Sequence, residues 1–321
     1  MRILLPFCLL CFPIACWGQN FLFQNQYNFR PYLVNPALAG DRNGGNVAIL
    51  YMKQLTGFDN SPNSQVISAD FPLPSSKIGF GINGFKDRNG SSSFTGVETT
   101  FAYHLVRKLE DGNPVSGLSF GLSGTYNQFN LNGTSWKPLD ADDLTLADIN
   151  RFSESFPNAN LGFNFFSYGF NAGLSVYNLI PKSSNIYLPT DIQNALHFIL
   201  STSYSASLKD KLKLTPRFLC RIQQSGDYQL DLATEVTYVL SGGASFSVAP
   251  FYRNFGYSTL NGRQSFGINL LVVRKPLEAG YQIDIPLSSI NRFSTGNHVF
   301  FLAIKIKDQS KKAEKPELEK D

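Results

Sequence analysis

The chain has 321 residues, and 28 lysines and arginines against 24 aspartates and glutamates give it a formal net charge of +4. Only 16% of its residues are charged, against ~25% in an average soluble domain, whereas aromatic residues reach 14%. A hydrophobic fraction of 43% is too high for a disordered chain and too low for a bundle of membrane helices, and the scattered basic residues lack the clustering that nucleic-acid binding needs.

Residues 1–18 have the pattern of a cleaved secretory signal. Arg2 precedes an apolar run over residues 3–17, and Gly18 supplies a small residue at its end. Two prolines interrupt the run, which is shorter than the ~20 apolar residues of a membrane-spanning helix. We therefore expect the mature chain to begin at Gln19. The alternative is a lipoprotein acylated at Cys16, although the residues before it lack the leucine usual in such signals.

Cleavage of the signal would leave Cys220 as the only cysteine of the mature chain. An intramolecular disulfide is then impossible, so an exported protein of this size must be held by its core, its sheet closure or a membrane. Cys220 follows Phe218 and Leu219, which favours a small buried or lipid-facing hydrophobe over a reactive thiol.

Strand-length segments with period-two alternation recur through residues 46–307. In residues 118–127, for example, large apolar side chains alternate with Gly, Ser, Thr and Asn. Two later segments, 229–238 and 278–285, carry charged residues on their polar face. Fourteen such segments begin near Val47, Ser64, Lys77, Phe94, Gly117, Asn158, Phe170, Ala195, Lys211, Tyr228, Gly243, Ser265, Leu277 and His298.

This pattern predicts an all-β protein, a transmembrane antiparallel β-barrel of about 14 strands in the outer membrane, because bacterial barrels have even strand counts from 8 upward. The alternative is a large soluble β-sandwich, which also buries one face of each strand. One face of each predicted strand is apolar. The opposite face is dominated by Gly, Ser, Asn and Thr, as a polar lumen requires. Aromatic residues at strand ends resemble the girdles of such barrels, namely Tyr103, Tyr126, Phe129, Tyr177, Tyr204, Tyr238 and Tyr252.

Three segments fall outside the strand pattern. Residues 19–45 are rich in Asn, Gln and aromatics. Residues 130–156 form a loop whose Asp140, Asp142, Asp143 and Asp148 either bind Ca²⁺ or, as the better interpretation, form a solvated acidic loop. Residues 308–321 carry nine charges in fourteen positions, so we expect a disordered periplasmic tail.

We expect residues 19–45 to fold back into the barrel as a lumenal plug. Pro31 and Pro36 fit poorly in a central strand because they cannot donate hydrogen bonds. The large apolar side chains around them would be costly to leave in water, namely Tyr27, Phe29, Tyr32, Leu33 and Leu38. Asn35 would bond backbone groups in the turn before Pro36, and Gly40 would be a flexible joint into the first strand. The alternative is a leader that approaches the wall from outside.

Several motifs of the chain resemble one protein family. The residues that carry the resemblance are Gln26-Tyr27, Pro31, Asn35-Pro36-Ala37 and Ala39-Gly40, then Tyr51, Gln54 and Gly57, then Ser61-Pro62 with Gln65, Ser68, Asp70 and Pro72, and finally Gly79, Gly81, Asp87 and Gly90. In these positions the sequence resembles the PorP/SprF family, outer-membrane proteins associated with the type IX secretion system of Bacteroidota.

The resemblance implies a non-enzymatic outer-membrane barrel without a cofactor that works in protein export or gliding motility. It implies three kinds of partner: outer-membrane lipids, secretion components including periplasmic ones, and a secreted adhesin-type substrate protein. The residues to which it points are those of the possible plug: Gln26, Tyr27, Pro31, Asn35, Pro36, Ala37 and Gly40.

Catalytic and metal sites have weak support in the sequence. Residues 117–121 match G-x-S-x-G, but Ser119 lies within an alternating strand, where a nucleophile elbow needs a strand-to-helix turn. His104, His197 and His298 fall on three separate strands without metal-ligand spacing. Two rival functions remain: a passive transporter of hydrophobic small molecules, which should have an apolar lumen, and a lipid hydrolase, which needs a Ser and a His on adjacent strands that we do not find paired in the sequence.

Overall fold

The computed structural model describes residues 25–41, 44–73, 77–110, 113–132, 152–180, 195–224, 226–256 and 263–306. The secretory signal, the four aspartates between positions 140 and 148, and the tail 308–321 lie outside these residues, so the expectations for them stay predictions. No helix among the described residues has the length and apolar character needed to cross a membrane.

The described strands form one antiparallel sheet. In chain order they are β1 (Gly45–Lys53), β2 (Asn63–Pro72), β3 (Ile78–Asn89), β4 (Ser92–Glu110), β5 (Asn113–Leu131), β6 (Phe152–Ser167), β7 (Phe170–Tyr177), β8 (His197–Tyr204), β9 (Ala206–Lys209), β10 (Leu212–Gln223), β11 (Tyr228–Val239), β12 (Ser245–Gly256), β13 (Arg263–Arg274), β14 (Leu277–Pro286) and β15 (Asn297–Ile306). Two 3₁₀ turns, Ser241–Gly243 and Ser289–Arg292, lie between strands.

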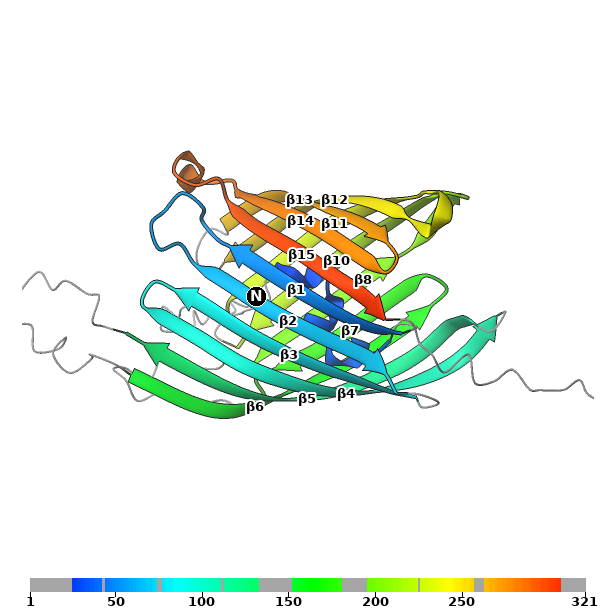
Figure 1. The fold of residues 1–321 in the computed structure, drawn as a ribbon, viewed down its shortest axis with the longest axis horizontal. Coiled ribbons are helices and arrows are strands. Elements are labelled where there is room, and N and C mark those ends of the chain that lie inside the picture. Colours follow the sequence, from blue (N-terminus) through cyan, green and yellow to red (C-terminus); the bar gives the residue numbers. More distant parts are fainter. Residues whose placement is uncertain are drawn as a thin grey trace, which may run out of the picture.

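The sheet closes on itself into a barrel of fourteen strands (Figure 1). β8 and β9 both pair with β10 and are separated by Ser205 alone, so they form one strand of the wall. β1 pairs with β15 from Gly45↔Ile306 to Lys53↔His298, which joins the first strand to the last. The predicted closed antiparallel barrel and its strand count are thus confirmed. The largest error in a predicted start is at β6, which begins six residues earlier than expected.

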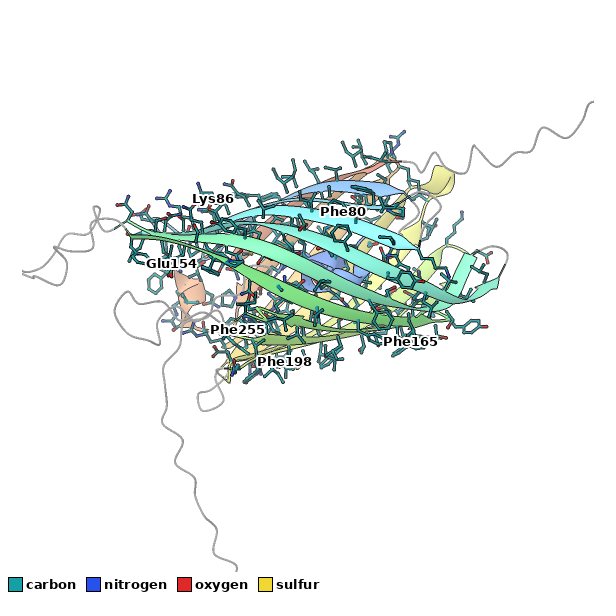
Figure 2. All side chains as sticks on the ribbon, turned by 90° about the horizontal axis from the view of Figure 1, so that it is seen from below. Phe80, Lys86, Glu154, Phe165, Phe198 and Phe255 are labelled. Atoms are coloured by element: carbon teal, nitrogen blue, oxygen red, sulfur yellow. The ribbon has the colours of Figure 1, made fainter. Side chains whose placement is uncertain are left out.

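The two faces of the wall follow the period-two pattern of the sequence. In β5, Phe120 and Leu122 are about half exposed on the outer face, while Ser119 and Ser123 are buried on the inner face. Figure 2 shows the labelled Phe80 and Phe198 on the outer surface of different parts of the wall. An outer apolar surface and an inner polar surface are the arrangement of a membrane barrel.

Two of the departures from this pattern share one cause. Tyr177, which we expected in an aromatic girdle, is buried inside the barrel. The inner face of β1 is apolar instead of polar, with Ala48, Leu50 and Met52 all 1% exposed. Tyr177 and the three β1 side chains contact residues of the N-terminal segment. They therefore pack against protein and not against water. Cys220 is a free thiol on β10, partly exposed on the outer face beside Leu200 and Leu230.

The connections at the two ends of the barrel differ in length. At the end where β1 begins and β15 ends, the connections 111–112, 168–169, 210–211 and 275–276 have two residues each. At the other end, the connections include 54–62, 132–151, 178–196 and 287–296. We call these the short-turn end and the long-loop end.

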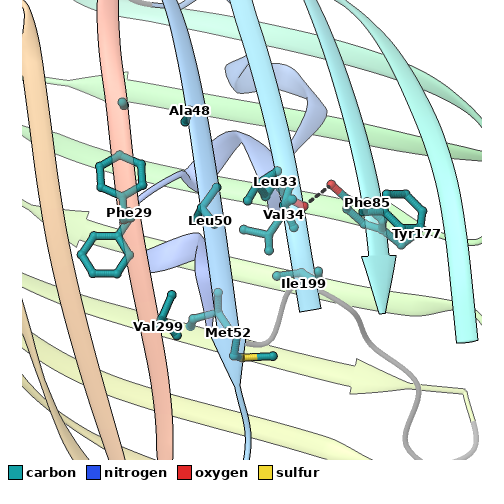
Figure 3. Close-up of a cluster of buried hydrophobic side chains, with 14 residues drawn as sticks. Phe29, Leu33, Val34, Ala48, Leu50, Met52, Phe85, Tyr177, Ile199 and Val299 are labelled. Carbon is teal, nitrogen blue, oxygen red and sulfur yellow. Dashed lines mark hydrogen bonds between the residues drawn. The ribbon is translucent and has the colours of Figure 1, made fainter. Parts of the chain in front are cut away.

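Residues 25–41, which we call the lumenal segment, lie inside the barrel (Figures 1 and 3). They form three 3₁₀ turns, η1 (Gln26–Asn28), η2 (Pro31–Val34) and η3 (Pro36–Leu38). Pro31 and Pro36 each begin a turn, a position where the missing N–H is not needed. The segment starts beside Met52 near the long-loop end of β1 and reaches the short-turn end at Asp41, from which the chain enters β1.

Candidate functional site

The lumenal segment and the inner face of the wall form the most extensive buried site in the described chain. Three apolar side chains of the segment, Phe29, Leu33 and Val34, pack against β1 and β15. Phe29 and Phe301 are stacked with ring centroids 5.0 Å apart and planes 5° apart. Figure 3 shows Leu33 and Val34 beside Leu50 in the same cluster. Each large apolar side chain buried in this way contributes roughly 1.5–3 kcal/mol.

Side chains of β7 donate to the backbone of η2, and Asn35 joins η3 to β6. Ser175 donates to the Val34 carbonyl at 2.6 Å, and the Tyr177 hydroxyl donates to the Leu33 carbonyl at 3.1 Å. Asn35 caps η3, because its Oδ1 accepts from the Ala37 N–H at 3.0 Å while its Nδ2 donates to the Phe163 carbonyl at 3.0 Å. These bonds fix a segment that has neither helix nor sheet partners of its own.

A buried ion pair joins the segment to β2. The Arg30 guanidinium donates to Asp70, and both side chains are at most 3% exposed. The second oxygen of Asp70 accepts the Gly40 N–H at 3.0 Å. Removing one partner of such a pair leaves an uncompensated buried charge, which typically costs about 3–5 kcal/mol. Asp70 therefore fixes the segment at two points, before and after η2 and η3.

The opposite side of the lumen holds the start of the segment through a second charged network. The Tyr27 hydroxyl donates to Asp231 on β11. Arg253 on β12 donates to both oxygens of Asp231, at 2.8 and 2.7 Å, and to Asp284 on β14 at 2.9 Å. Asn28 donates to the side chain of Gln282 at 3.0 Å. One arginine thus links two carboxylates of the wall, one of which also accepts from the segment.

Tyr32 reaches a third part of the wall. Its hydroxyl donates to Thr100 on β4 at 2.9 Å, and Thr100 lies 2.8 Å from the Ser123 hydroxyl. The adjacent Glu98 accepts from Asn83 at 3.0 Å and from Asn160 at 2.6 Å. Burial raises the pKa of the Tyr27 and Tyr32 hydroxyls, so both stay protonated and act as donors.

Glycines of the wall make room for the segment. A Cβ atom at Gly121 would overlap with Pro36 and Ala37, and one at Gly162 would overlap with the Asn35 side chain. Gly40 has a φ of +63° and packs against the backbone of Phe71 and Gly79. It is therefore a tight turn with a bonded N–H, where we expected a flexible joint.

All seven residues to which the sequence pointed lie in this segment. Gln26, Asn35, Pro36, Ala37 and Gly40 are buried, whereas Tyr27 and Pro31 are partly exposed. The sequence did not identify their wall partners. Asp70 stood among the resemblance residues, and Asp231 and Asp284 stood on charged strand faces, but nothing in the sequence paired them with the segment.

One catalytic expectation needs correction, because a Ser and a His do meet on adjacent strands. Register places His104 opposite Ser119, and its Nδ1 lies 2.9 Å from the Ser119 Oγ. The Nε2 atom lies 2.9 Å from the Ala39 carbonyl, which can only accept, so Nε2 carries the proton and Nδ1 accepts from Ser119. The pair thus orients His104 as an anchor of the segment, and Ser119 is 3% exposed.

The other two histidines lie apart from this pair. His197 is buried on β8, and His298 on β15 contacts the Tyr281 hydroxyl at 2.6 Å and Thr295 at 3.0 Å. Within the described ranges, no group of three or more His, Cys, Asp or Glu side chains is placed to hold a metal ion.

Comparison with known families agrees with this architecture. A family model described as the type IX secretion system membrane protein PorP/SprF matches residues 18–304. The chain belongs to this family. The family and the barrel fold confirm the predicted outer-membrane location and identify this PorP/SprF protein as a membrane component of a secretion system. No curated protein matches the sequence.

Solved structures similar to this PorP/SprF protein are distant in sequence. A toluene transporter of Ralstonia pickettii, TbuX, has 11% identity and a TM-score of 0.47, over 85% of this chain and 92% of that one. A FadL homologue of Pseudomonas aeruginosa has 11% identity and a TM-score of 0.45, over 84% and 89%. These values carry no argument about function.

We predict that Gly121→Val displaces the lumenal segment without unfolding the wall. Overpacking typically costs about 1–3 kcal/mol, so the fraction of displaced segment should rise about tenfold. A thiol placed at the fully buried Ala37, in a Cys220→Ala background, should then react about tenfold faster with a membrane-impermeant maleimide.

The matched control is Gly124→Val in the same strand, because a Cβ atom there meets nothing within 4 Å. It should leave the thiol protected. Equal labelling rates in the two valine variants would contradict the close packing of η3 against β5.

Proposed function

We propose that this PorP/SprF protein supports the export or surface presentation of secreted proteins such as adhesins, as a closed scaffold in the outer membrane and not as the conduit for cargo. The observation that carries the proposal is the filled lumen. Segment residues contact β2, β4, β6, β7, β11, β14 and β15, which are distributed around the wall.

A polypeptide passing through this lumen would have to break those contacts together. Two buried charged networks and an apolar cluster would lose their partners, and each buried charge left unpaired is costly. A scaffold function needs none of this rearrangement. The filled lumen therefore supports a role in which cargo passes beside the barrel or through another component.

The short turns support an orientation of the protein in the membrane. Outer-membrane barrels have short periplasmic turns and longer extracellular loops. We therefore propose that the short-turn end faces the periplasm. The tail 308–321 follows β15 at this end, and its nine charges in fourteen residues would offer periplasmic secretion components an electrostatic docking site. Lipids of the outer membrane would contact the apolar outer face.

The family supports the finer assignment. The family resemblance links such proteins to gliding motility and surface adhesins in Bacteroidota. A secreted adhesin would then be the substrate protein that this barrel helps to export. The rival function, passive transport of hydrophobic small molecules, requires an open path through the lumen. One experiment, on a strain without the protein, distinguishes the scaffold from the transporter.

We predict that a strain without this protein loses adhesins from its surface and that the wild-type gene restores them. Quantitative proteomics of proteins released by surface proteolysis measures the loss. Uptake of a hydrophobic small molecule, such as toluene, should be unchanged in the same strain. An unchanged surface proteome together with reduced toluene uptake would contradict the scaffold and favour the transporter.

We also predict that deletion of residues 27–39 raises outer-membrane permeability to small solutes and leaves the barrel assembled. The reason is that a fourteen-stranded barrel has more interior than its inward-facing small side chains fill. Heat-modifiable mobility on gels reports assembly, and influx of a small chromogenic substrate reports permeability.

The matched control is deletion of residues 308–321, a segment of similar length that follows the last strand. It should leave both assembly and permeability unchanged. If the properly assembled 27–39 deletion keeps its permeability barrier, then something other than the lumenal segment closes the lumen.

A further inference from the structure

The lumenal segment has a direction, which its contacts with the wall define. At its start, the Asn25 side chain donates to the sulfur of Met52 at 3.3 Å, and Met52 is the last residue but one of β1. Tyr27 donates to Asp231, the fourth residue of β11 counted from the long-loop end. The segment therefore starts just inside the long-loop end of the barrel.

The segment finishes at the opposite end. Gly40 packs against Phe71 and Gly79, which border the β2–β3 connection at the short-turn end. From there the chain enters β1, whose first residue, Gly45, pairs with Ile306. The wall thus begins and ends at the short-turn end, whereas the chain in front of it starts at the long-loop end.

The start of the segment is a buried part of the plug. Asn25 is 2% exposed and Gln26 is fully buried. Turning the segment round in the lumen would separate Arg30 from Asp70 and leave both charges buried and unpaired, which is costly. The contacts with the wall therefore hold Asn25 at the long-loop end.

Chain length limits where the residues before Asn25 can go. Cleavage of the predicted signal leaves six residues, 19–24, in front of it. From Met52 down to Gly45, β1 advances by seven residues, which is about 23 Å of strand and roughly 18 Å of height at the usual tilt. Six residues reach about 20–22 Å only when fully extended. A return to the short-turn end would use nearly all of that reach in a straight run beside the lumenal segment, whereas the long-loop end is one residue of β1 away.

We propose that the lumenal segment carries the mature N-terminus through the barrel to the long-loop end, where residues 19–24 are accessible from the cell surface. The cell-surface side of this proposal rests on the orientation proposed above, in which the short-turn end faces the periplasm. The barrel then holds its own chain across the outer membrane, with the N-terminus outside and the tail 308–321 in the periplasm. A protein that arrives at the cell surface meets one end of the plug without entering the lumen.

The test uses the full-length protein in intact cells and a maleimide joined to a polyethylene glycol that is too large to pass through porins. Three variants are made in a Cys220→Ala background: Asn20→Cys before the segment, Ser289→Cys in the connection 287–296, and Ser310→Cys in the tail. Ser289 is exposed at the long-loop end. Asn20→Cys and Ser289→Cys should be labelled to the same extent before and after disruption of the outer membrane. Ser310→Cys should be labelled only after disruption.

Phe21→Cys is a second variant in case Asn20→Cys alters cleavage of the signal, and only heat-modifiable protein is scored. Labelling of Ser289→Cys alone in intact cells would overturn the proposal and leave the orientation in place. Labelling of Ser310→Cys in intact cells, with the other variants protected until disruption, would overturn the proposal by reversing the orientation. The two failures are therefore distinguishable.

Discussion

A closed wall of fourteen strands encloses more space than the small side chains on its inner face can fill, and the rest of this structure depends on how that space is occupied. Residues 25–41 occupy it, and several departures from ordinary strand design are found where they do so. β1 has an apolar inner face, Tyr177 points inward, and Gly121 and Gly162 lack side chains where η3 approaches. Each of these features follows from the presence of the segment.

The lumenal segment is held by contacts with side chains of the wall, and not by hydrogen bonds within the segment. Its 3₁₀ turns satisfy few backbone groups internally, so two side chains of β7 donate hydrogen bonds to the carbonyls of Leu33 and Val34. Two arginines, Arg30 and Arg253, neutralise carboxylates that would otherwise be buried without a counter-charge. Breaking either network would leave a buried charge unpaired, which is costly. That cost is the physical reason to regard the lumen as closed.

Alternation in the sequence was enough to predict the strands, because a period of two is a local property that survives without knowledge of neighbours. The small polar residues of one face and the aromatics at strand ends favoured a barrel over a sandwich. Neither pattern could predict contacts across the lumen. Arg30 and Asp70 are forty residues apart and Tyr27 and Asp231 are 204 apart, and only the closed geometry brings them together. The His104–Ser119 pair was missed for the same reason, since it needs the register of β4 and β5.

The inner face of β1 shows a second limit of prediction from sequence alternation. Ala48, Leu50 and Met52 alternate with Val47, Ile49 and Tyr51, so both faces of the strand are apolar. Such a strand fits the wall of a sandwich as well as that of a barrel. What decides its inner face is the lumenal segment, whose Phe29 and Val34 cover it, and no property of β1 alone indicates that cover.

Single-channel recording of the purified wild-type barrel in a planar lipid bilayer tests the closed lumen most directly. The contacts of residues 25–41 predict insertions without a steady ionic conductance, over a voltage range in which the bilayer itself is stable. A constant open-channel conductance in most insertions would contradict the account, because ions would then be passing a lumen that the segment fills.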